Sequence, residues 1–86
     1  EKERGGEGER GSDGAGGDLE RKERAGAVRE AIAALPGELR EAIVLFEFEE
    51  MSQAEIAVTV GASVKAVEAR VARAREKLRV ALRRWV

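Results

Sequence analysis

A helix start, a helix stop and a second helix start follow one another between residues 52 and 63, and they constrain the fold more than any other feature. Ser52 and Glu55 have the spacing of a capping box, in which hydroxyl and carboxylate each bind a free backbone N–H. Gly61 can end that helix, because glycine adopts the left-handed conformation at low cost. Ser63 can then cap a second helix. The pattern predicts a helix-turn-helix, whose second helix can lie in a DNA major groove.

The segment after Ser63 has the periodicity of a long amphipathic helix. Its apolar side chains form one stripe, which we expect to be buried: Val64, Val67, Val71, Ala74, Leu78, Leu82 and Trp85. A neighbouring face carries Ala66, Ala69, Arg70, Arg73 and Lys77. Small residues there let the backbone approach a groove, and Arg70 and Arg73 can reach bases or phosphates together. A basic face is often merely solvated, but the capped helix and glycine turn upstream favour DNA binding.

The charge is divided unevenly along the chain. The net charge at pH 7 is -1. Residues 63–86 nevertheless hold eight Lys or Arg against two Glu, a net of +6, so residues 1–62 carry -7. The basic end is the part that would meet a polyanion.

The composition argues against several other kinds of site. Without Cys or His, the chain has no disulfide, no thiolate or imidazole zinc site and no histidine general base. We therefore expect no metal, no cofactor and no small-molecule substrate. No apolar run approaches the roughly 20 residues that span a bilayer, and the first residues are too polar for a signal peptide. We expect a cytoplasmic protein that makes no membrane contact.

Four helices and a preceding tail are predicted. Residues 1–18 are acidic and glycine-rich, with one alanine as their only apolar side chain, so we expect a disordered linker or tail. Residues 19–86 should form an all-α, small four-helix domain with a C-terminal helix-turn-helix and a long recognition helix. The helices are expected from an Asp18 cap to about Leu35, with a first half that frays, from Pro36 to about Glu49, from Gln53 to Val60, and from Val64 to about Arg84.

Two aromatic residues need a place in this arrangement. The second helix is apolar over more than one face, so Phe46 is either half-buried or part of a protein-binding patch. Trp85 is more often a core residue than a ligand platform.

Short motifs lie in order from Leu35 to Leu82: Leu35-Pro36, Glu38-Leu39-Arg40-Glu41, Glu47-Phe48-Glu49, Ser52, Glu55-Ile56-Ala57, Gly61, Ser63-Val64, Val67 and Arg70-Val71-Ala72-Arg73-Ala74-Arg75. Together they resemble region 4 of bacterial sigma factors, in the extracytoplasmic-function group of the sigma-70 family. The resemblance implies a domain that reads the minus-35 promoter element with its last helix. It also implies docking on the beta flap of the RNA polymerase core to direct transcription initiation, and often capture by an anti-sigma factor.

The resemblance also assigns roles to single positions. Bases would be faced by Lys65, Ala66, Glu68, Ala69, Ala72 and Arg73, and the phosphate backbone by Arg40, Ser52, Gln53 and Arg70. The family often has Lys or Arg where this chain has Glu68, and Thr where it has Ala66. The Glu68 carboxylate can accept a hydrogen bond from a cytosine amino group but also repels phosphate, so we expect an unusual preferred sequence or a low affinity. Glu50 stands where glycine is common, so the second helix must end without one.

Alternative functions come from different classes. The chain could be a protein interaction module, captured by an anti-sigma factor or polymerase through its basic helix and the surface around Phe46. It could also be a free-standing helix-turn-helix transcription regulator, although the Ala-Arg-Ala-Arg run at residues 72–75 is unusual there. We do not expect an enzyme, because Ser52 and Ser63 are assigned to caps and no base is placed to activate a hydroxyl. The adjacent carboxylates of Glu49 and Glu50 point apart on a helix.

Overall fold

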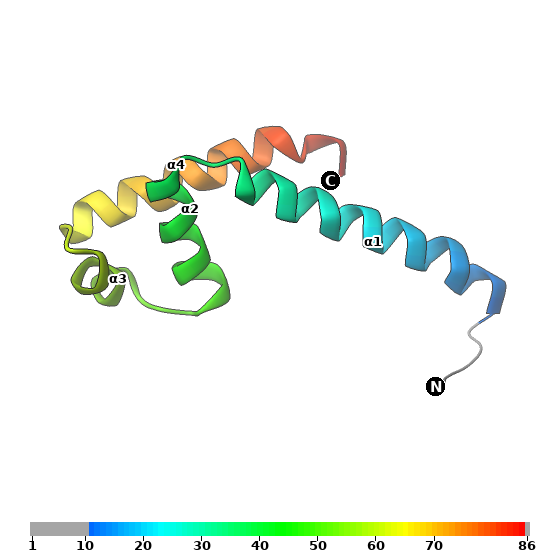
Figure 1. Cartoon of the computed structure of the whole chain (residues 1–86), viewed down its shortest axis with the longest axis horizontal. Coiled ribbons are helices and arrows are strands. Elements are labelled where there is room, and N and C mark those ends of the chain that lie inside the picture. The colour runs from blue at the N-terminus through cyan, green and yellow to red at the C-terminus, as the bar shows by residue number, and fades with distance from the viewer. Residues whose placement is uncertain (1–10, 86) are drawn as a thin grey trace.

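A computed structural model describes residues 11–85, with side chains from Gly17 onward, and Figure 1 shows their helices. The elements in order are α1 (Gly11–Ala33), α2 (Gly37–Ile43), the π-helical turn η1 (Val44–Phe48), α3 (Gln53–Val60), α4 (Val64–Ala81) and the 3-10 turn η2 (Arg83–Trp85). The predicted all-α class is confirmed. For residues 1–10, the predicted tail lies outside the described part of the chain.

Both ends of α3 are set by the local chemistry that the sequence predicted. The Ser52 N–H donates to Glu55 Oε1 at 2.8 Å, and the Glu55 N–H donates to Ser52 Oγ at 3.0 Å, so the capping box is complete. Gly61 ends the helix at φ 73° and ψ 40°, and its N–H donates to the Ala57 carbonyl at 3.0 Å. The turn that follows is therefore fixed by backbone bonds rather than by side-chain packing.

The start of α4 is capped in the same way. Ser63 has an extended backbone, and its Oγ accepts from the Ala66 N–H at 3.0 Å. The predicted boundary is therefore correct, but only the middle of the expected apolar stripe is buried, and its last three members, Leu78, Leu82 and Trp85, are half-buried. Val64 is 47% exposed, because it occupies the first helical position, where α4 extends past its packing partners.

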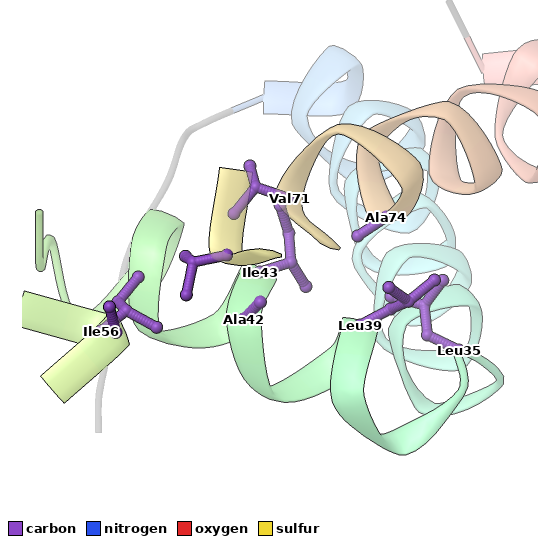
Figure 2. Close-up of a cluster of buried hydrophobic side chains, with 9 residues drawn as sticks. Leu35, Leu39, Ala42, Ile43, Ile56, Val71 and Ala74 are labelled. Carbon is purple, nitrogen blue, oxygen red and sulfur yellow. The ribbon is translucent and has the colours of Figure 1, made fainter. Parts of the chain in front are cut away.

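The core lies where α2 crosses α4 and where α3 packs against α4 (Figure 2). Its nine buried residues are all aliphatic: Leu35, Leu39, Ala42, Ile43, Ile56, Ala57, Val67, Val71 and Ala74. Ile56 of α3 and Val67 of α4 are fully inaccessible to solvent. The helix-turn-helix is thus attached to the rest of the domain through α2.

The second helix ends differently from the prediction. We expected an α-helix to about Glu49, but α2 stops at Ile43 and continues as the wider turn η1. The Glu49 N–H donates to the Val44 carbonyl, five residues back, at 3.1 Å. The wider turn lets Val44, Leu45 and Phe46, three consecutive residues, all pack against the core. Glu50 follows at φ 57°, in the left-handed region that glycine prefers.

The first helix is longer at its N-terminus than predicted. It begins at Gly11 rather than at an Asp18 cap, so residues 11–18 of the predicted tail are helical. Asp18 instead pairs with Arg21, one turn onward, and Glu20 pairs with Arg24 at 3.9 Å. Adding a residue to an existing helix costs little compared with starting one, which explains the extension. The side chains of residues 18–25 are exposed.

The last helix folds back along the first. Helix α4 ends at Ala81, three residues before the predicted end, and the chain closes with η2. Figure 1 shows this end of the chain beside the middle of α1. Leu82 and Trp85 are half-buried and line a groove with Ala27 and Ala31. Trp85 therefore packs at the surface, against α1, rather than in the core. Among the described helices, none combines the length and apolar character required to cross a bilayer.

Candidate nucleic-acid interface

The outward face of α4 carries most of the residues predicted to face bases. Over its first three turns the exposed side chains include Lys65, Glu68, Ala69, Ala72 and Arg73, whereas Ala66 is half-buried. Lys77 is exposed one turn further on. Buried residues occupy the opposite side of the same turns. The predicted residues are thus exposed at the end of α4 that adjoins α3 (Figure 1), but Glu68 and Arg73 lie about 140° apart around the helix and so on neighbouring faces.

Arg70 points to the side of this surface. Its side chain is only 20% exposed, and its Nη2 lies 3.7 Å from Oε2 of Glu38, in the first turn of α2. A phosphate contact from Arg70 would have to compete with this ion pair. Arg73 forms no ion pair with any residue that the structure describes. Arg73 is thus the more accessible of the two for a nucleic acid.

The start of α3 offers hydrogen-bond donors beside the same surface. Ser52 is exposed and Gln53 is half-buried. Because Ser52 Oγ accepts from Glu55, the hydroxyl hydrogen of Ser52 can still donate to an oxygen outside the protein. The N–H of Gln53 precedes the first intrahelical bond, which runs from Ile56 to the Ser52 carbonyl at 2.9 Å. Donors of this kind suit a phosphate oxygen.

Arg40 has a structural task besides its predicted one. Its Nη1 donates to the carbonyls of Ala33 at 3.0 Å and Leu35 at 3.2 Å. These carbonyls lie at the end of α1, where helical partners are lacking. Arg40 thereby fastens α1 to α2. Its other N–H groups leave a phosphate contact chemically feasible, and that contact stays a prediction.

Comparison with protein families decides which helix-turn-helix this is. The sequence model described as Sigma-70, region 4 matches residues 25–78, which include all of α2 and α3 and most of α4. The chain belongs to the sigma-70 region 4 family. Region 4 domains bind DNA in sigma factors and recognise the minus-35 promoter element, and the family implies promoter DNA and RNA polymerase as partners. A comparison with curated proteins gives no match.

This region 4 domain contains a contact that the sequence did not predict. Arg75 of α4 donates to Glu47 Oε2 from Nε at 3.0 Å and from Nη2 at 2.5 Å. The same guanidinium lies over the Phe46 ring, 5.2 Å from its centroid. Arg75 thus joins α4 to η1. Glu47 lies 28 residues away in the chain, so no local pattern could have indicated the pair.

The aromatic residues of the domain divide into packed and exposed ones. Phe46, which we expected to be either half-buried or a partner contact, is half-buried and packs against the core. Phe48 is 61% exposed. It lines a groove with Ala25, Val28 and Ile32 of α1, which is rimmed by Arg21, Arg24 and Arg29. The sequence indicated only that the second helix is apolar over more than one face; the exposure of Phe48 depends on the path of η1, which no local pattern encodes.

The region 4 domain offers no catalytic arrangement in its described part. Ser52 and Ser63 act as caps, as predicted, and the Thr59 hydroxyl donates to the Glu55 carbonyl at 2.9 Å. No group of acidic, His or Cys side chains among the described residues could hold a metal ion. The family is a DNA-binding family rather than a catalytic one.

Proposed function

We propose that this domain is the DNA-binding specificity module of an alternative sigma factor of the extracytoplasmic-function type. It reads the minus-35 promoter element with α4 and thereby directs transcription initiation. The observation that carries the proposal is the exposed, alanine-rich and basic face of α4, held by the capped turn between α3 and α4. Small side chains at Ala69 and Ala72 let the helix enter a major groove closely, and Lys65 and Arg73 provide the charge.

Phosphate contacts would position the helix. The hydroxyl of Ser52 and the N–H of Gln53 lie at the start of α3, and Lys77 lies further along α4. Each phosphate that a Lys or Arg neutralises releases counterions, so the logarithm of the affinity should fall with the logarithm of salt concentration by about 0.9 per such cation, whereas the neutral donors add no salt dependence.

Fluorescence anisotropy of the whole chain would test this function. A labelled duplex with a candidate minus-35 element is compared with a scrambled duplex over a salt series. We expect tighter binding to the candidate and a steep salt slope. Equal, weak binding to both would contradict direct promoter reading and would leave polymerase to position the domain.

Arg73→Ala should weaken binding to the preferred duplex by about 10-fold and binding to the scrambled duplex less, because a base contact is worth about 1–3 kcal/mol of discrimination. Arg83→Ala is the matched control, since it removes the same charge from η2, beyond the C-terminal end of α4. Equal losses on both duplexes would assign Arg73 to phosphate rather than to bases.

A second proposed contact is with protein. The apolar groove of Phe48, Val28 and Ile32 lies apart from the base-facing residues of α4, and we propose that it docks on the beta flap of RNA polymerase. An anti-sigma factor would compete with polymerase there.

Phe48→Arg should reduce binding to the isolated flap by about 10-fold, whereas Val58→Arg, at a site 85% exposed on α3, should not. Full flap binding by Phe48→Arg would exclude this groove.

A further inference from the structure

The base-facing surface of α4 contains one carboxylate that no neighbour neutralises. Glu68 is exposed in the second turn and forms no ion pair with any described residue. The other acid of α4, Glu76, pairs with Arg79. The neighbouring Ala69 and Ala72 carry no charge, and Lys65, one turn earlier, forms no ion pair with Glu68. The charge of Glu68 therefore faces whatever binds this surface.

A bare carboxylate at a DNA interface needs a donor. It is repelled by phosphates and by base acceptors, and in the major groove only the amino groups of cytosine and adenine can donate to it. Adenine places its N7 acceptor next to the amino group, where it repels the second carboxylate oxygen. Guanine and thymine present acceptors alone. The expected order of preference is therefore cytosine, then adenine, then guanine and thymine.

We propose that Glu68 is a specificity-determining residue that selects a cytosine in the promoter strand beneath the second turn of α4. The inference rests on the proposed function, because it requires the outward face of α4 to lie in the groove. Because no ion pair compensates Glu68 within the described part of the chain, its desolvated charge needs a donor on the DNA, and this makes Glu68 selective. Glu68 thus rejects other bases more strongly than it attracts cytosine.

Substitutions at this one position would test the proposal. Selection from a duplex pool randomised over about one helical turn first gives the preferred sequence of the unaltered chain. Anisotropy then compares all four base pairs at each selected position. We expect a preference of about 10-fold for cytosine at one position, and its loss in Glu68→Ala. At that same position, Glu68→Gln should favour adenine and Glu68→Lys should favour guanine, following the hydrogen-bonding pattern of each side chain.

Glu76→Gln is the control, because it removes an acid two turns along α4 and should leave every base preference unchanged. Circular dichroism checks that each variant folds. If Glu68→Ala binds all duplexes more tightly by one common factor, Glu68 only repels DNA and the proposal is overturned. Unchanged binding by every Glu68 variant would overturn it as well. If the unaltered chain selects no sequence, the result would instead contradict the proposed function, in which α4 reads promoter DNA.

Discussion

Single residues in this domain take backbone and ionic roles that depend on their exact surroundings. Glu50 adopts φ 57° immediately after η1, and a side chain in the left-handed region costs on the order of 1–2 kcal/mol. A glycine would relieve that strain but would also be more flexible in the unfolded chain. The chain accepts the strain because η1 must turn sharply toward the start of α3.

Glu50→Gly should therefore stabilise the domain by about 0.5–1 kcal/mol. This value is the backbone strain that glycine relieves minus the additional conformational entropy that glycine loses on folding. Glu49→Gly is the matched control: it removes the same charge at φ -94°, where glycine brings only the entropic cost, and it should destabilise. Urea denaturation followed by circular dichroism measures both. Equal destabilisation by the two variants would show that Glu50 is unstrained.

Secondary-structure elements were predictable where their ends depend on neighbouring residues. The bounds of α3 and the start of α4 follow from Ser52, Gly61 and Ser63, whose hydrogen bonds span three or four residues. The π-helical turn and the pairing of Arg75 with Glu47 depend on how α2 packs against α4, and no local pattern encodes that packing. For the same reason, sequence alone placed Arg70 at the DNA without detecting its pairing with Glu38.

Ser52→Ala should destabilise the domain by about 1 kcal/mol, because the Glu55 N–H loses its capping acceptor. Thr59→Ala provides the control. It removes a hydroxyl from the same helix, but one that bonds an already paired carbonyl, so stability should stay within about 0.5 kcal/mol. Thermal unfolding of both variants distinguishes the loss of the cap from the loss of any hydroxyl. A similar loss of stability in the two variants would contradict the capping role of Ser52.

At the scale of the whole molecule, the domain has a packed end and a projecting end. The core joins α2, α3 and α4, whereas α1 contacts the rest mainly near its own C-terminal half, where Leu82 and Trp85 meet Ala27 and Ala31. This arrangement could not be read from the sequence, because the apolar side chains of α1 are few and mostly small. Helix α1 is therefore held by few contacts.

Trp85→Ala should loosen α1 while leaving the helix-turn-helix intact. We expect amide hydrogens of residues 26–33 to exchange roughly 10-fold faster, since loss of a half-buried aromatic removes on the order of 1–2 kcal/mol of burial. Amides of α3 should exchange as before. Val80→Ala, at an exposed site on α4, serves as the comparison. Unchanged protection of α1 would show that Trp85 does not hold it.

Helix α4 also acts as a lever. Its 18 residues form a rod of about 27 Å, supported near its middle by Val71 and Ala74, with Lys65 and Glu68 near one end and α1 beside the other. A tilt of about 5° about that support displaces each end by roughly 1 Å, enough to spoil hydrogen bonds that tolerate only a few tenths of an ångström. If α4 reads the promoter as proposed, a shift of α1 against α4 would change that reading without any contact between α1 and the DNA.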